Sequence, residues 1–419
     1  MKEWQEKLKD EGSGLWAHLI SLVKWGVLAA VVGAGIGAMG VAFHVCVEWA
    51  TKLREASPAL LYFLPMAGLI IVAMYHFSGI HDDKGTNFVI VAVRENAPMR
   101  FRTAPLIFIA TVITHLFGGS SGREGAALQM GGAIASKLGH SLGFPEDDTR
   151  ILVVCGMSAA FSALFGTPLA AAVFAMEMVH VGVMHYAAIV PAFLSSLIAA
   201  LLSQFLGLAP TKFHLAQVPA LSALSLGQLI LLGVLCGVLS IFFCGMMHVA
   251  PYLYQKAFHS PYLRVAVGGL LVVLLSLLAG TRDYNGAGEE VIAAAIGGSA
   301  VPWAFALKMV FTCLTLGAGF KGGEIVPVFF TGATFGCVVG PLLGLPASFS
   351  AAVGMAALFC GVTNCPITSL LLAYELFGGQ GLELIALSCA VSYLISGYGG
   401  LYTEQKIVYS KVSAKRNRK

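Results

Sequence analysis

Two glycine-rich stretches, each carrying a glutamate, are the residues of this 419-residue chain whose types and spacing best suit chemistry. The first reads Gly-Gly-Ser-Ser-Gly-Arg-Glu-Gly over 118–125, and the second reads Lys-Gly-Gly-Glu over 321–324. Each precedes an apolar run that predicts a helix. The first amides of a helix lack intrahelical acceptors and carry partial positive charge. Two such ends that face each other would therefore bind an anion without a buried full cation.

Glu124 is the most informative single residue. An ionised carboxylate at the mouth of an anion site competes with the anion as an internal ligand and leaves when it is protonated, which couples proton movement to anion movement. The alternative is a capping glutamate that only complements the helix dipole, and the sequence leaves both open. Glu324 holds the matching place in the second stretch and would be a second pathway carboxyl, its titration coupled to that of Glu124. For Glu177 and Glu375, which lie near predicted helix ends, we expect structural capping or interface salt bridges.

The two stretches belong to an internal repeat. Gly122, Glu124 and Gly132 match Gly322, Glu324 and Gly332 at an offset of 200 residues. At nearly the same offset, residues 156–178 match residues 354–376. A weaker match, which lies before the glycine-rich stretches, pairs residues 85–90 with residues 287–292. Two related halves in one chain are typical of transporters and some channels, whose sites form at the repeat interface from interrupted helices.

The elements that position these residues must lie in a membrane. Hydrophobic residues make up 58% of the chain and charged residues only 11%, against roughly 25% in soluble domains. Stretches without Lys, Arg, Asp or Glu are long enough for helical crossings, which need roughly 20 apolar residues each; they are 25–47, 56–81, 103–122, 151–176, 178–211, 213–255, 325–374 and 384–403. The composition predicts an all-α polytopic membrane protein and argues against a soluble enzyme or a nucleic-acid-binding protein.

The chain divides into four predicted segments. We expect an N-terminal cytoplasmic amphipathic helix over 1–20, a first transmembrane repeat over 21–210, a second over 211–403, and a basic cytoplasmic tail over 404–419 with no regulatory domain. Basic residues near both ends place both termini in the cytoplasm by the positive-inside rule. We expect a multi-pass protein of the cytoplasmic membrane.

Nothing in the sequence calls for a metal, a cofactor or an enzymatic reaction. Nine cysteines stand singly in apolar segments without the spacing of a zinc site. An intramembrane enzyme is a remote alternative, because Ser120 and Ser121 lack a nucleophile motif and HExxH is missing.

The residues Gly122-Arg123-Glu124-Gly125, the later Gly322-Gly323 with Pro327, and the tyrosine Tyr402 resemble the CLC family of anion channels and proton-coupled anion exchangers. The resemblance covers about residues 20 to 410. It implies a homodimer with one pathway in each subunit, antiparallel halves of broken and tilted helices, Glu124 as the gating glutamate and Tyr402 as the central tyrosine.

Departures from the chloride-handling members resemble the fluoride-exporting branch. Glu324 stands where those members have an apolar residue, and Met178 stands where they place an inner proton-transfer glutamate. The branch's anion-site residue maps to Thr86 or Asn87, and the sequence does not decide between them. The expected anion-binding set is Gly85, Thr86, Asn87, Phe88, Arg123, Gly125, Gly323, Ile325 and Tyr402.

The prediction is a fluoride/proton antiporter whose partners are fluoride, protons, the lipid bilayer and a second copy of itself. Fluoride is small and strongly hydrated, so hydroxyl, amide and protonated carboxyl donors must replace its water. A chloride/proton antiporter or a chloride channel of the same family is the alternative.

Overall fold

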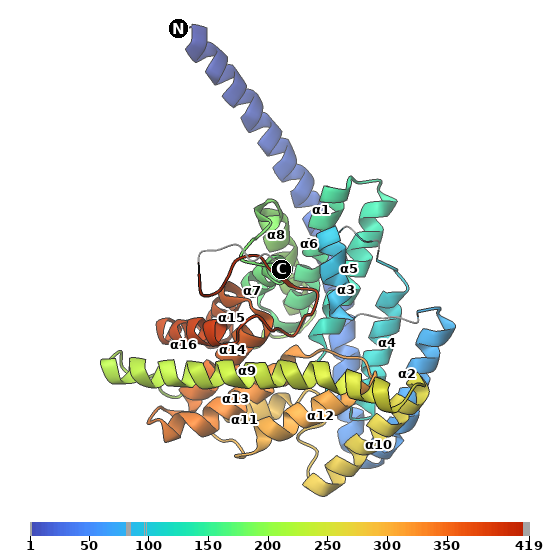
Figure 1. Ribbon diagram of the computed structural model, residues 1–419. Helices are drawn as coiled ribbons and strands as arrows, with labels where there is room; N and C mark the ends of the chain where they lie inside the picture. The colour runs from blue at the N-terminus through green and yellow to red at the C-terminus, as the bar shows by residue number, and fades with distance from the viewer. Residues whose placement is uncertain (1, 81–84, 96, 98, 414–419) are drawn as a thin grey trace.

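The computed structural model describes residues 2–80, 85–95, 97 and 99–413, with residues 2–13 described by their backbone only. The described chain forms two sets of eight α-helices (Figure 1). The first set comprises α1 (Lys2–Ala56), α2 (Leu64–Phe77), α3 (Thr86–Glu95), α4 (Thr103–Leu116), α5 (Glu124–Ser141), α6 (Glu146–Phe165), α7 (Pro168–Glu177) and α8 (Ile189–Phe205). The second comprises α9 (Ala223–Ala257), α10 (Pro261–Ala279), α11 (Glu289–Ile296), α12 (Ala304–Ala318), α13 (Ile325–Leu342), α14 (Ala347–Thr363), α15 (Pro366–Phe377) and α16 (Leu382–Ile395).

Minor elements join these helices. They are the 3-10 helices η1 (Pro58–Phe63) and η2 (Tyr186–Ala188) and the two-residue strands β1 (His180–Val181) and β2 (Lys406–Ile407). The strands pair in parallel, with His180 opposite Lys406. This pairing fixes the chain beyond α16 to the end of the first repeat.

The sequence repeat is a repeat of helix packing. In the first half, a Cβ on Gly131 of α5 would lie 2.2 Å from the carbonyl oxygen of Gly156 on α6. In the second half, a Cβ on Gly332 of α13 would lie 2.4 Å from the carbonyl oxygen of Gly354 on α14. Glycine at these positions lets the two backbones touch, which is how membrane helices pack most closely.

The helices have the lengths and apolarity of membrane spans. In the described part of the chain, seven helices are long and apolar enough to cross a membrane, and six further apolar helices are shorter. The charge-free stretch 325–374 divides into α13, α14 and the start of α15, as expected for shorter and interrupted helices.

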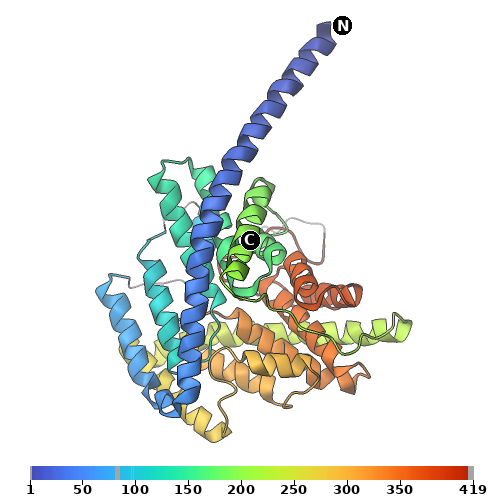
Figure 2. The same ribbon diagram turned by 180° about the vertical axis from the view of Figure 1, so that it is seen from behind.

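The predicted segment boundaries fall at different kinds of position in the structure. No break separates residues 1–20 from the first span, because α1 runs unbroken over 55 residues and its first turns project beyond the other helices (Figures 1 and 2). The chain has no proline before Pro58, so the helix continues through Gly12, Gly14 and Gly26. The predicted boundary at 210/211 falls in the irregular connection between α8 and α9. Of the predicted basic tail, residues 414–419 lie outside the described chain.

Candidate functional site

The two glycine-rich loops are hydrogen-bonded to each other. The Gly122 amide donates to the Gly323 carbonyl at 2.7 Å, and the Gly323 amide donates to the Gly122 carbonyl at 2.8 Å. These reciprocal bonds join the loop before α5 to the loop before α13. The predicted convergence of two helix starts from different repeats is therefore confirmed.

Only glycine fits where the loops cross. A Cβ on Gly323 would lie 2.8 Å from the amide nitrogens of Glu124 and Gly125 and from Oε2 of Glu124. A Cβ on Gly122 would lie 2.3 Å from the same Oε2. Side chains at either position would push the carboxylate away and prevent the close approach of the backbones.

Glu124 reaches from one repeat to the other. It is the first residue of α5 and its side chain is fully buried. Oε2 accepts a hydrogen bond from the Val326 amide, in the first turn of α13, at 3.3 Å. Oε1 has no hydrogen-bond partner among the described residues. The carboxylate thus occupies an amide at a helix start where an external anion would bind.

Glu324 lies beside the same loops without a comparable partner. It immediately precedes α13 and makes no capping bond to it. Its Oε2 is buried and unpartnered within the described chain. A Cβ on Gly125 would lie 3.2 Å from this oxygen and 2.8 Å from Oγ1 of Thr86. Thr86, Gly125 and Glu324, all predicted site residues, therefore meet at one point.

The other predicted residues of the first motif differ in their roles. Gly85 has a φ of +58°, so it turns the chain into α3 in a conformation that favours glycine. Asn87 accepts a hydrogen bond from the Glu404 amide at 3.2 Å through its side-chain oxygen. Phe88 is half-buried and packs against the apolar core. Between the two candidates left open by the sequence, the hydroxyl of Thr86 is the one next to Gly125 and Glu324.

Tyr402 lies where a central tyrosine is expected. Its side chain is buried and its hydroxyl has no hydrogen-bond partner in the described structure. It lies within electrostatic reach of Glu324 and Glu124. The Tyr402 hydroxyl is therefore available to donate a hydrogen bond to a ligand.

Arg123 and Ile325 flank the two glutamates by sequence. The guanidinium of Arg123 donates to Oε1 of Glu289, at the start of α11, at 2.8 Å. Its charge is therefore paired with a carboxylate in this conformation. Ile325 is fully buried as the first residue of α13, so its side chain serves packing and any contribution to an anion is through its backbone.

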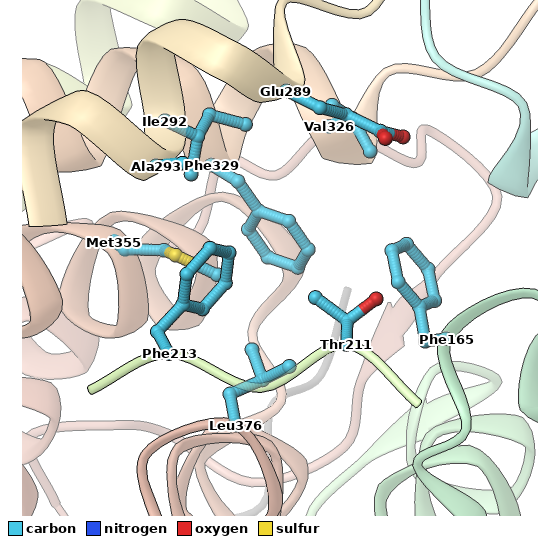
Figure 3. A pocket seen from close by; sticks show the side chains of 10 residues that line it. All are labelled: Phe165, Thr211, Phe213, Glu289, Ile292, Ala293, Val326, Phe329, Met355 and Leu376. Atoms are coloured by element: carbon cyan, nitrogen blue, oxygen red, sulfur yellow. The ribbon is translucent and has the colours of Figure 1, made fainter. Parts of the chain in front are cut away.

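A cavity of about 220 Å³ adjoins the segment that holds Glu124 (Figure 3). The rings of Phe165, Phe213 and Phe329 face this space from three different segments. Val326 and Glu289, which contact Glu124 and Arg123, line it as well. The cavity therefore reaches the hydrogen-bond partners of Glu124 and Arg123.

A second pair of glutamates closes two other helix starts. The carboxylate of Glu177 accepts hydrogen bonds from the amides of Ile367 and Thr368, and from the Thr368 hydroxyl, at the start of α15. Glu375 in turn accepts from the amides of Leu169 and Ala170 at the start of α7, at 2.9 Å each. The capping role expected for both residues is confirmed, and the caps are exchanged between the repeats.

The chain is similar to known membrane proteins over most of its length. The family model described as "Voltage gated chloride channel" matches residues 67–397. A relative from Pseudomonas syringae pv. tomato, named "Chloride/fluoride channel protein", is 35% identical over 93% of this chain and 88% of its own. The chain belongs to the CLC family.

Other members of the CLC family give the same architecture. The solved structure "Crystal structure of a CLC-type fluoride/proton antiporter" is similar with a TM-score of 0.89 and 33% identity, over 93% of this chain and 99% of that chain. An "H(+)/Cl(-) exchange transporter ClcA" from Yersinia pseudotuberculosis is 27% identical over 93% of this chain and 87% of its own. The CLC-type inverted repeat of broken helices and the multi-pass membrane character are thus confirmed.

Sequence reasoning missed two functional features. The donor to Glu124 is Val326, an apolar residue that contributes only its amide, so its side chain gave no signal. The loop-to-loop bonds of Gly122 and Gly323 involve backbone atoms alone. The repeat alignment, which pairs Gly122 with Gly322, points to the neighbouring residue.

Proposed function

We propose that this CLC protein is a proton-coupled fluoride exporter in which Glu124 is the gate. The observation that carries the proposal is the bond from the Val326 amide to the Glu124 carboxylate. An acid on one repeat occupies the helix start of the other, so an arriving anion must replace it. Protonation weakens the hold of the amide on the side chain and frees the site, which links one proton to the movement of the anion.

Fluoride rather than chloride is favoured by the donors around the site. The Thr86 hydroxyl and the Glu324 carboxyl both lie against Gly125, and the Tyr402 hydroxyl is unpartnered. A protonated Glu324 would be a short, strong donor to fluoride, which is a far better hydrogen-bond acceptor than chloride. The similarity to a chloride/fluoride channel protein and to a fluoride/proton antiporter supports the same choice.

The protein would work as a homodimer in the cytoplasmic membrane, with both termini in the cytoplasm and without enzymatic activity. Each subunit contains Glu124, Glu324 and both glycine loops, so each would hold a complete pathway. The basic residues at both ends support this orientation.

Purified protein in liposomes tests the proposal. We expect fluoride efflux, followed with a fluoride electrode, to drive proton uptake, and chloride to move more slowly by at least about tenfold. In E124Q, proton uptake should fall by roughly a hundredfold, because the amide cannot carry a proton. E290Q, which alters an exposed glutamate of α11, is the matched control. Equal rates for chloride and fluoride would favour a chloride/proton antiporter, and anion flux without proton movement would favour a channel.

A further inference from the structure

Lys308 of α12 is a buried charged residue to which the proposed transport steps give no role. Its side chain is fully buried, and its ammonium donates to the carbonyls of Tyr284 at 3.2 Å and Gly286 at 2.7 Å. The ammonium also lies 5.0 Å from the centre of the Phe330 ring. None of these partners is a carboxylate, and an ammonium is costly to bury without one. Both carbonyls belong to residues 284–286, here called the strap, in the connection between α10 and α11.

The strap lies against the glycine-rich loop that precedes α5. The side-chain amide of Asn285 donates to the Gly118 carbonyl at 2.8 Å. The backbone amide of Gly286 donates to the Gly119 carbonyl at 3.1 Å. The strap thus joins the buried ammonium to the start of the loop that leads into Glu124.

The contacts on the other sides of the strap restrict its conformation. Asn285 is buried and its side chain is hydrogen-bonded to the Ser276 hydroxyl of α10, which fixes the orientation of its amide group. Gly286 has a φ of +62°, and a Cβ there would lie 2.4 Å from Nη1 of Arg54. Lys308 completes this arrangement by binding the carbonyls on either side of Asn285.

The same face of α12 also holds the glycine-rich loop directly. The Ser120 amide donates to the Thr315 hydroxyl at 3.0 Å, and the hydroxyls of Ser120 and Thr312 lie 3.1 Å apart. Residues 308, 312 and 315 are four and three positions apart, so their side chains share one face of the helix. This face therefore supports the loop twice, through two threonine hydroxyls and, by way of the strap, through Lys308.

We propose that Lys308 is a positioning residue for the Glu124 gate. Its ammonium holds the strap, the strap holds the carbonyls of Gly118 and Gly119, and the loop fixed in this way places the Glu124 carboxylate on the Val326 amide. Without the ammonium, the strap shifts and the loop follows, so fluoride passes a displaced Glu124 that has not been protonated. Loss of Lys308 therefore uncouples fluoride from protons. This inference rests on the proposed fluoride/proton exchange.

The test measures fluoride efflux and proton uptake in the same liposomes with the full-length protein. Because both ions are counted in the same vesicles, their ratio does not depend on the fraction of protein that is folded. K308M removes the ammonium and keeps a long side chain, and N285A removes the bond to Gly118 while Lys308 stays in place. We expect the fluoride-to-proton ratio to rise at least about twofold in each variant, because the gate is misplaced. A protein with both substitutions should show a ratio no higher than that of K308M, because both changes act through the strap.

M309A is the matched control, because Met309 is the buried neighbour of Lys308 on α12. Its truncation should lower the thermal stability and leave the ratio unchanged. A wild-type ratio in K308M or in N285A would overturn the proposal, and N285A decides alone if K308M does not fold. A raised ratio in M309A would also overturn it, because any loosening of α12 would then uncouple transport. So would a ratio in the double variant well above that of either single variant. Absence of coupled exchange in the wild type would instead refute the proposed function.

Discussion

Two pairs of repeat-related helices place a carboxylate on the start of a helix in the other repeat, and they do so differently. At α7 and α15 both starts are capped, each by two backbone amides that donate to one carboxylate. At α5 and α13 the described residues form one hydrogen bond of this kind, from the Val326 amide to Glu124 at 3.3 Å, while Glu324 lies beside Gly125 of α5 with its Oε2 unpartnered. The contacts of Glu177 and Glu375 are those of structural caps. The contact of Glu124 with the other repeat is that of a ligand that can leave.

The largest effect is expected at the crossing of the two loops. G323A places a Cβ 2.8 Å from the Glu124 amide and carboxylate, and neither the backbone nor the anion site can yield. We expect exchange to fall by more than about tenfold, because one misplaced contact displaces the gate. Fluoride efflux from liposomes measures it.

G245A is the control for this change, since a Cβ on Gly245 of α9 meets no atom within 4 Å. Exchange in G323A at the rate of G245A would show that the loops have room to separate. The close contact would then not be needed to seat Glu124.

The second effect separates the two helix pairs by stability. E375Q leaves one capping oxygen in place and replaces the other with an NH₂ group. That group cannot accept from the amide of Leu169 or Ala170, so one buried amide loses its partner. We expect the free energy of unfolding to fall by about 2 kcal/mol. The exchange ratio of the folded protein should be unchanged. Thermal unfolding in detergent and proton-coupled flux measure the two quantities.

E124Q is the matched comparison for E375Q. It should abolish coupling with a smaller loss of stability than E375Q, because one bond of 3.3 Å joins that carboxylate to the other repeat, where Glu375 has two of 2.9 Å. A loss of stability in E124Q as large as that in E375Q would contradict the distinction between a structural cap and a removable ligand.

A third, smaller effect concerns the fluoride donors. T86V keeps the shape of the side chain and removes the hydroxyl that faces Gly125. We expect the apparent fluoride affinity to weaken by about 1 kcal/mol, or roughly fivefold, as one donor is lost. The concentration dependence of fluoride flux measures this change. N87L serves as the comparison, because Asn87 receives the Glu404 amide through its side-chain oxygen, and an equal or larger loss of affinity there would assign the donor to Asn87.

The smallest effect concerns the turn that presents the start of α15 to Glu177. Lys411 donates to Oδ1 of Asn364 at 2.5 Å and to the Tyr393 carbonyl, and burial lowers its pKa to about 8. The folded protein therefore disfavours the charged form relative to the unfolded chain. Its stability should rise between about pH 8 and the ordinary lysine pKa near 10.4, where only the unfolded chain keeps the proton. K411M should remove this rise, as followed by thermal unfolding across pH 7–10.5, and an identical rise in K411M would assign it to other groups.

The sequence was sufficient to predict the fold but not the hydrogen-bond partners of the site residues. Apolar stretches and the repeat indicated an all-α membrane protein built from two related halves, and the resemblance carried by Gly122–Gly125 and Gly322-Gly323 implied the CLC-type arrangement. Glu124 and Glu324 were found from their type and their place after glycine pairs. The partner of Glu124 was not found, because the amide of Val326 leaves no trace in side-chain chemistry.

The extent of the first helix could not be read from the sequence. An amphipathic helix was expected over residues 1–20, and α1 continues from it into the first span through Gly12, Gly14 and Gly26, because no proline interrupts the chain before Pro58.

The paired bonds between Gly122 and Gly323 also restrict how access to the ion can alternate. Rigid-body rocking of one half against the other, which many repeat-built carriers use, would have to shear both bonds in every cycle. Rotation of the Glu124 side chain would leave both bonds intact and would move only a few atoms. In the proposed mechanism, the two halves therefore stay fixed relative to each other, and the moving part is the Glu124 side chain.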